Sequence, residues 1–345
     1  MPSPHDIATL ALESEVDWPR DLDRAPLPGL TEIEPPPWNE VLGPLFPRGG
    51  PNGLVLKDGK TIVEWGDPDR CDLTFSVAKS YLSILAGVAV ADGLIASLDD
   101  AVNKTLPGPA FDGAHNGAIT WRHLLTMTSE WEGELWGKPD LIDRNRQLGP
   151  GADNSRKGQH RDLQMPGRFW EYNDVRVNLL SLCLMQLFRR PLPEILRERI
   201  MDPIGATGDW TWHGYENSYV DIDGVRMQSV PGGSHWGGGM RISSRDHAKF
   251  GQLILDGGVH DGRRLLPEGW TESIRRPTPV NDAYGMLWWL NTGRAEWKTG
   301  PEDSFAAIGA GGNIIWIAPR ERIVLVARWI DAPAVDPLIE KALAL

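Results

Sequence analysis

The sequence is poor in cysteine and carries more acidic than basic residues. Cys71 and Cys183 are its two cysteines, too few for a disulfide framework or a cysteine-based metal cluster. Lysine and arginine number 35 against 47 aspartate and glutamate, so the net charge is −12. Such a chain repels a phosphate backbone, and no local basic cluster reverses this average. Nucleic-acid binding is therefore not expected.

Long hydrophobic runs are also missing. No apolar stretch approaches the roughly 20 residues that a membrane-spanning helix requires. The first 22 residues, MPSPHDIATLALESEVDWPRDL, lack the basic and apolar regions of a secretory signal. The eight histidines show no paired metal-ligand spacing. We therefore expect a cytoplasmic protein that needs no metal or organic cofactor and does not bind membranes, with its oligomeric state left open.

The pattern of hydrophobic residues predicts strands near both ends of the chain. A hairpin is expected over 53–66 around the Asp58-Gly59 turn, and further strands over 284–291, 304–318 and 322–330. Helices are expected over 74–93, 120–129, 173–188, 243–258 and 333–345. Residues 1–50 are expected to wrap the surface without regular structure, and 119–225 to be mostly helix and loop.

This order predicts an α+β protein in which one sheet is built from both termini. We expect residues 1–95 and 235–345 to form the sheet domain and residues 96–234 a mainly helical lobe. The active site should lie between them. The polar stretch 137–165 is expected to be a surface loop along one edge of that site.

Ser76 and Lys79 are the first candidates for catalysis. They stand three residues apart near the start of the helix expected over 74–93, so their side chains share one face. A serine hydroxyl needs a neighbouring base to act as a nucleophile. The positive end of the helix and burial among apolar neighbours should lower the pKa of Lys79 and make it such a base. The spacing alone is common by chance, so the surrounding sequence has to support it.

The surrounding sequence resembles the β-lactamase-related serine hydrolases. The run TFSVAKSYLSILAGVAVADGLIASLDD contains the S-x-x-K motif as Ser76-Val77-Ala78-Lys79, and ITWRHLLTMTSEWEG follows it. PGRFWEYNDVRVNLL supplies a tyrosine, Tyr172, after a Pro-Gly lead-in. This superfamily includes class C β-lactamases, DD-peptidases, family VIII carboxylesterases and 6-aminohexanoate-oligomer hydrolases. The resemblance implies a β-lactamase/transpeptidase-like fold, and it implies that Tyr172 acts with Lys79 in proton transfer.

Two departures from the family pattern affect the substrate. Asp174 stands where the family usually has asparagine, which removes an amide contact and adds a negative charge. The family's third motif, K-T-G or H-x-G, has two candidates here. The strand pattern favours Ala307-Ile308-Gly309, whereas a literal Lys298-Thr299-Gly300 is followed by proline and acids, which are poor strand formers.

The choice of third motif has chemical consequences. The cationic residue of this motif helps to bind a substrate carboxylate in β-lactamases and DD-peptidases. If Ala307 takes its place, the site should prefer esters or amides of uncharged acyl groups. By resemblance, Gly309 allows a close approach to substrate, and the N–H of Ala310 joins that of Ser76 in an oxyanion hole.

Other residues are weaker candidates for substrate contacts. Trp236 and His235 lie in the glycine-rich turn of 234–246, and Trp131 and Trp136 could wall a pocket. No G-x-S-x-G element supports a Ser-His-Asp triad. The expected function is a serine hydrolase that acts through an acyl-enzyme. The alternatives are a β-lactamase or DD-peptidase-like enzyme and a non-catalytic acyl-binding relative.

Overall fold

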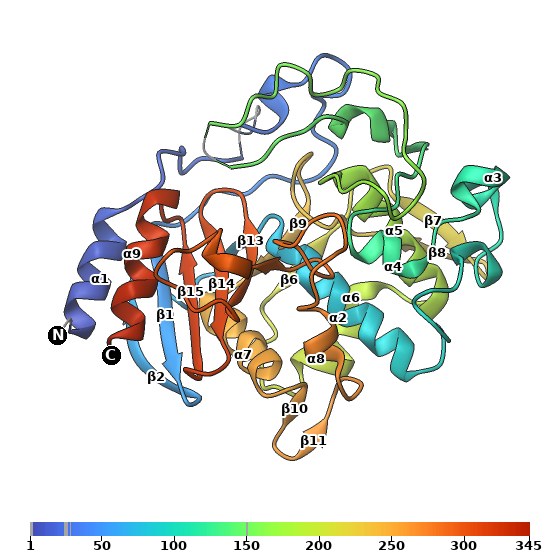
Figure 1. The fold of residues 1–345 in the computed structure, drawn as a ribbon. Helices are drawn as coiled ribbons and strands as arrows, with labels where there is room; N and C mark the ends of the chain where they lie inside the picture. Colours follow the sequence, from blue (N-terminus) through green and yellow to red (C-terminus); the bar gives the residue numbers. More distant parts are fainter. Residues whose placement is uncertain (1–2, 24–26, 28, 150) are drawn as a thin grey trace.

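The computed structural model describes residues 3–23, 27, 29–149 and 151–345 (Figure 1). Its main element is a six-stranded antiparallel sheet with the order β12-β13-β14-β15-β1-β2. The strands span Asn52–Lys57 (β1), Lys60–Trp65 (β2), Trp289–Leu290 (β12), Phe305–Gly309 (β13), Asn313–Ala318 (β14) and Ile323–Arg328 (β15). Because β1 pairs with β15, one sheet joins both ends of the chain, and the predicted α+β class is confirmed.

The sheet is buried on both faces. Helices α1 (Pro4–Glu13) and α9 (Ala332–Leu343) pack side by side on one face, and α7 (Ser244–Leu255) covers the other (Figure 1). Successive side chains of a strand point to opposite faces. Trp316 of β14 therefore packs with the α1 and α9 core, while Ile315 and Ile317 face the α7 side. Burial on both sides explains why β14 and β15 are almost continuously apolar.

Helix α2 (Val77–Ala91) lies between the sheet and a mainly helical lobe. It contacts β13 and β14 on one side and helices α5 and α6 on the other. Every residue of α2 from Val77 to Ala89 is buried, which agrees with its lack of a polar face. The lobe contains α3 (Gly113–Asn116), α4 (Trp121–Leu125), α5 (Asp174–Phe188), α6 (Leu192–Leu196) and the π-helical turn Arg197–Met201. The domain boundaries near residues 95 and 235 stay a prediction.

Two expectations about local structure were wrong. The N-terminal segment contains α1, whose first turn is capped by Ser3 and Asp6. The expected strand over 284–291 shortens to β12, because backbone turns bring the N–H of Gly285 to the carbonyl of Trp288. Residues 119–225 are mostly helix and loop, as expected, and contain a few short strands.

The remaining strands are short and form one three-stranded sheet and three ribbons. The sheet has the order β3-β9-β6, with strands Asp72–Leu73, Gly239–Ile242 and Thr211–His213. The ribbons pair β4 (Glu134–Leu135) with β5 (Lys138–Pro139), β7 (Tyr219–Ile222) with β8 (Val225–Gln228), and β10 (Val259–His260) with β11 (Arg263–Arg264). Short turns and helices complete the chain: Thr31–Ile33, Val102–Lys104, Pro109–Phe111, Asp140–Asp143, Trp270–Ser273 and Thr292–Arg294. No helix in the described part of the chain has the length and apolarity needed to cross a membrane.

The start of α7 offers a test of the fold. Ser243 caps this helix by accepting a hydrogen bond from the N–H of Asp246 at 3.0 Å. We expect Ser243→Ala to lower the free energy of unfolding by about 1 kcal/mol, measured by urea denaturation, because the first turn loses its acceptor. Ser243→Asp keeps an acceptor and should retain most of the stability. Equal stability of the Ala variant and the wild type would contradict the cap.

Candidate active site

A cavity of about 510 Å³ opens beside the start of α2. Its lining combines polar, aromatic and backbone groups: Ser76, Arg146, Leu148, Gly149, Tyr172, Trp289, Glu296, Ile308, Gly309 and Ala310. Ser76 is half-buried and directly precedes α2, while Phe75 before it has a positive φ of 49°. Such a backbone is costly for a bulky residue unless its surroundings hold it. Here the Phe75 ring is buried with edge contacts to Trp18 and Trp329.

Lys79 joins Ser76 to the helical lobe. Its Nζ lies 2.8 Å from Ser76 Oγ and 2.5 Å from Asp174 Oδ1 at the start of α5. The lysine side chain is only 1% exposed, so both contacts are shielded from water. The i, i+3 spacing therefore gives the expected proximity of the two side chains. The partner from α5 was not expected.

The pKa of Lys79 differs from the sequence-based expectation. Burial acts to lower it, as predicted, but the nearby Asp174 carboxylate and Tyr172 outweigh burial, and the pKa of Lys79 is raised. Burial likewise acts to raise the pKa of Asp174, and the charges of Lys79 and Arg146 hold it well below its usual value. The resting pair is therefore an ammonium and a carboxylate. The prediction of a lowered lysine pKa was wrong because it considered only the helix that carries the lysine.

Asp174 has further partners on its second oxygen. Arg146 Nη1 lies 2.6 Å from Asp174 Oδ2 and 3.4 Å from Asp143 Oδ1, and His235 Nδ1 lies 3.4 Å from Asp174 Oδ2. Arg146 comes from the polar loop of 137–165, which lines the cavity edge as expected, and it was missed as a site residue. A lone arginine in a loop without periodicity gives no sequence signal.

Tyr172 lines the cavity and lies close to the lysine. Lys79 Nζ is 4.8 Å from the centre of the tyrosine ring, which stacks on Trp289 at 5.9 Å. Asn173, the next residue, caps α5 through the N–H of Arg176 and donates to the Asp140 carbonyl at 2.8 Å. These contacts fix the backbone that carries the tyrosine.

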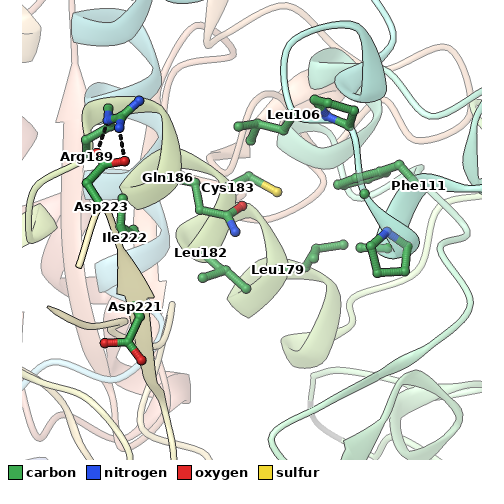
Figure 2. A pocket seen from close by; sticks show the side chains of 14 residues that line it. Leu106, Phe111, Leu179, Leu182, Cys183, Gln186, Arg189, Asp221, Ile222 and Asp223 are labelled. Carbon is green, nitrogen blue, oxygen red and sulfur yellow. Dashed lines mark hydrogen bonds and ion pairs between the residues drawn. The ribbon is translucent and has the colours of Figure 1, made fainter. Parts of the chain in front are cut away.

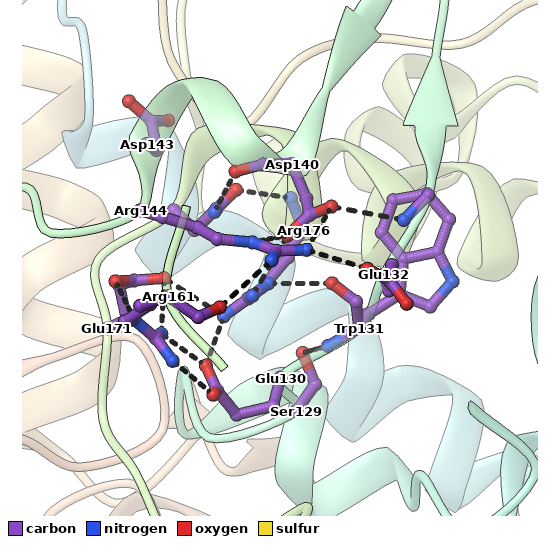
Figure 3. Close-up of polar contacts among 12 residues, drawn as sticks. Ser129, Glu130, Trp131, Glu132, Asp140, Asp143, Arg144, Arg161, Glu171 and Arg176 are labelled. Carbon is purple, nitrogen blue, oxygen red and sulfur yellow. Dashed lines mark hydrogen bonds and ion pairs between the residues drawn. The ribbon is translucent and has the colours of Figure 1, made fainter. Parts of the chain in front are cut away.

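A buried ionic network lies beside this backbone (Figure 3). Arg176 Nη1 contacts Glu130 Oε1 at 2.8 Å, and Arg161 pairs with both Glu130 and Glu171. Glu171 directly precedes Tyr172. Removing one member of a buried ion pair costs about 3–5 kcal/mol, because an uncompensated charge is left behind. The network therefore holds the segment before α5 in one place.

Strand β13 supplies the opposite wall of the cavity. A Cβ on Gly309 would lie 2.2 Å from the Thr74 carbonyl oxygen and 3.1 Å from Ser76 N, so only glycine permits this approach. Ala310 follows in the turn, and no described residue accepts a hydrogen bond from its N–H or from that of Ser76. Ile308 lines the cavity, whereas Ala307 is buried in the core on the α2 side.

The literal Lys298-Thr299-Gly300 lies in the loop before β13 and does not line the cavity. Thr299 Oγ1 donates to Asp336 of α9 at 2.7 Å, which ties the loop to the C-terminal helix. The side chain of Lys298 is exposed. The structure thus brings Ile308-Gly309-Ala310 to Ser76, and it does not bring Lys298 there.

The weaker candidates are outside the described lining of the cavity. Trp131 is buried and donates to the Ala110 carbonyl at 2.7 Å, and Trp136 packs its ring edge on Tyr215 at 5.8 Å. Trp236 is fully buried and donates to Glu34 Oε2 at 2.9 Å. One ring nitrogen of His235 contacts Glu34 and the other contacts Asp174. His235 therefore lies beside the Lys79–Asp174 pair and outside the cavity lining.

Glu34, Asp143 and His235 come close enough to suggest a metal site. Lys157 already lies between the two carboxylates, with its Nζ 2.8 Å from Glu34 Oε1 and 3.3 Å from Asp143 Oδ1. Its ammonium supplies the positive charge that a metal would bring. The donor set is therefore a poor fit for a metal ion.

A second cavity of about 500 Å³ lies on the far side of α5, between that helix, residues 106–111 and the β7–β8 ribbon (Figure 2). Its one thiol, Cys183, is buried, and burial raises its pKa, so little reactive thiolate forms. Neither Ser76 nor Lys79 lines it. This second cavity therefore lacks the candidate nucleophile and its candidate base.

The close approach of β13 to α2 can be tested by adding one methyl group. Gly309→Ala should lower the free energy of unfolding by about 1–3 kcal/mol in urea denaturation, since the Cβ overlaps the Thr74 carbonyl. Gly108→Ala is the control, because a Cβ there meets no atom within 4 Å. Equal effects of the two substitutions would contradict the packing.

Comparison with known proteins agrees with this geometry. The Beta-lactamase family model matches residues 52–329. A 6-aminohexanoate-dimer hydrolase of Paenarthrobacter ureafaciens is 32% identical over 298 residues, which cover 81% of this chain and 72% of the relative.

Two solved structures share the fold. A family VIII carboxylesterase has a TM-score of 0.61 at 18% identity, covering 85% of this chain and 91% of its own. A D-stereospecific amidohydrolase from Streptomyces has a TM-score of 0.57 at 18% identity, and the match covers 84% of this chain and 93% of the amidohydrolase chain. The chain belongs to the Beta-lactamase family, within a group of hydrolases that share its fold.

Proposed function

We propose that this protein is a serine hydrolase that cleaves esters or amides through an acyl-enzyme on Ser76. The observation that carries the proposal is the 2.8 Å contact between Ser76 Oγ and Lys79 Nζ at the wall of a cavity. The N–H groups of Ser76 and Ala310 add to it, because no described residue accepts a hydrogen bond from either and two such donors suit a developing oxyanion. The family match and the 6-aminohexanoate-dimer hydrolase relative support hydrolysis.

The reaction would proceed in two halves. Neutral Lys79 accepts the Ser76 proton while Oγ forms a bond to the substrate carbonyl carbon. The tetrahedral intermediate then expels the alcohol or amine, which takes a proton from the Tyr172 hydroxyl, and the Lys79 ammonium returns a proton to Tyr172. Water attacks the acyl-enzyme by the same groups in reverse order and restores the Ser76 hydroxyl.

The charges around the cavity favour substrates without a carboxylate. Ala307 is apolar and buried, and the one cation in the described lining, Arg146, is already paired with Asp174 and Asp143. A free cation for a substrate carboxylate is thus missing from the described lining. This supports esters and amides over penicillins.

Labelling with a fluorophosphonate probe tests the nucleophile. We expect one covalent adduct on Ser76 by mass spectrometry, and we expect Ser76→Ala to lose the adduct and at least about 10³-fold of p-nitrophenyl ester turnover. Ser83→Ala, further along α2, is the control and should keep the adduct. An unlabelled wild-type protein would contradict the proposal, and nitrocefin turnover faster than ester turnover would contradict the substrate class.

The pH profile tests the base. The Asp174 carboxylate raises the pKa of Lys79, and the neutral lysine is the active form, so kcat/KM should rise with pH. Asp174→Asn removes that charge and lets burial and Arg146 lower the lysine pKa. The rising limb of kcat/KM should therefore shift to lower pH.

Asp143→Asn is the control for this prediction, because Asp143 contacts Arg146, Lys157 and the backbone N–H of Asp174 and makes no described contact with Lys79. It should shift the limb less than Asp174→Asn does. Circular dichroism across the pH range verifies that each variant is folded. A limb that stays in place or moves to higher pH in folded Asp174→Asn would rule out Lys79 as the titrating base.

A further inference from the structure

Arg328, the last residue of β15, is a fully buried cation whose described hydrogen bonds all go to neutral groups. Its side chain donates to the backbone carbonyls of Leu73 and Ile242, at 2.6 and 2.9 Å, and to the side-chain oxygen of Asn313. Burial lowers its pKa to about 10, against the charge of Asp72, so the arginine stays protonated at neutral pH. A buried charge is costly unless it is well hydrogen-bonded, and these three contacts stabilise it.

The guanidinium connects strands of two different sheets. Leu73 ends β3 and Ile242 ends β9 of the three-stranded sheet, whereas Asn313 begins β14 of the six-stranded sheet. A guanidinium is planar and directs its donors along fixed directions, so it can hold three acceptors in one arrangement. The single nitrogen of a lysine cannot reproduce that arrangement.

The contact to Asn313 leads to the first candidate oxyanion donor, Ala310. Asn313 pairs with Gly309 across the β13–β14 hairpin, and its side-chain amide donates to the Ala310 carbonyl at 2.6 Å. Gly311 and Gly312 complete the turn with positive φ angles of 73° and 68°. Because glycine allows many backbone conformations, this turn depends on outside contacts to fix the direction of the Ala310 N–H.

The contact to Leu73 leads to the second candidate donor, Ser76. Leu73 precedes the turn in which Phe75 has a positive φ of 49°. Such a conformation persists only where the surrounding structure holds the backbone. A hydrogen bond to the Leu73 carbonyl therefore helps to fix the turn that directs the Ser76 N–H.

We propose that Arg328 is a positioning residue for the oxyanion hole, because through Asn313 and Leu73 it sets the directions of the Ala310 and Ser76 N–H groups. The inference rests on the proposed serine hydrolase and adds a residue outside the described lining of the cavity. Donors favour the tetrahedral intermediate over the ground-state carbonyl when they already point at the place of the oxyanion. Loss of the arginine contacts should therefore weaken binding of the transition state more than binding of the substrate.

Two inhibitors of p-nitrophenyl butyrate hydrolysis separate these two states. Butylboronic acid forms a bond from boron to Ser76 Oγ, whose proton passes to Lys79, and becomes a tetrahedral anion. Pentanamide binds as a neutral, trigonal group. The quantity measured is the ratio of the two inhibition constants, together with kcat and KM for the ester.

Two variants disturb the proposed contacts in different ways. Arg328→Lys keeps the charge and loses the planar set of donors. Asn313→Asp keeps an acceptor for Arg328 but cannot donate to the Ala310 carbonyl. In both variants we expect butylboronic acid to bind at least about ten-fold more weakly and pentanamide less than about three-fold more weakly. The same variants should lower kcat and leave KM nearly unchanged.

Arg48→Lys is the matched control. Arg48 is also a buried arginine that donates to backbone carbonyls, among them those of Pro19 and Gly49. It makes no described contact with Ser76 or Ala310. Its replacement should lower the free energy of unfolding and leave the ratio of inhibition constants unchanged.

An unchanged ratio in either folded variant, or an equal change in Arg48→Lys, would overturn the proposed role of Arg328 while ester turnover still supports Ser76 catalysis. Circular dichroism and urea denaturation verify folding. Asn313→Asp retains the buried arginine and decides the question if Arg328→Lys does not fold. A wild-type protein in which Ser76 forms no covalent adduct would overturn both proposals.

Discussion

The buried contact between Lys79 and Asp174 connects the two parts of the molecule that the site requires. Lys79 belongs to α2, which packs against the sheet, and Asp174 begins α5 in the helical lobe. Both side chains are almost completely out of water. An isolated buried charge would be very costly, so each stabilises the charged state of the other. Ser76, one helical turn before Lys79, is held at the same junction.

Residues around the Lys79–Asp174 pair hold the site residues in position. Arg146 and His235 contact the second Asp174 oxygen, and the network of Glu130, Arg161, Glu171 and Arg176 fixes the segment that leads to Tyr172. On the opposite side, Arg328 donates to the Leu73 carbonyl before the Ser76 turn and to the Asn313 side chain, which itself donates to the Ala310 carbonyl at 2.6 Å. The two candidate oxyanion donors are therefore supported by one buried arginine.

The described lining of the cavity offers no free cation. Ala307, which the sequence pattern aligns with the cationic position of the third motif, is buried in the core, and Arg146 is paired with carboxylates of the protein itself. Trp289 and Tyr172 line the same cavity and stack on one another. This lining is consistent with the proposed preference for esters or amides of uncharged acyl groups.

The sequence by itself determined the features that depend on local spacing. The S-x-x-K pair and the helices follow from spacings of three to four residues, and the 53–66 hairpin follows from two short runs joined by an Asp-Gly turn. Tyr172 was found through its motif and its Pro-Gly lead-in. Only the tertiary structure decided the rest: that Asp174 raises the pKa of Lys79, that Arg146 and Glu296 reach the cavity from separate loops, and that Lys298 does not. Those contacts join residues far apart in the chain, and loops carry no periodicity from which their partners could be inferred.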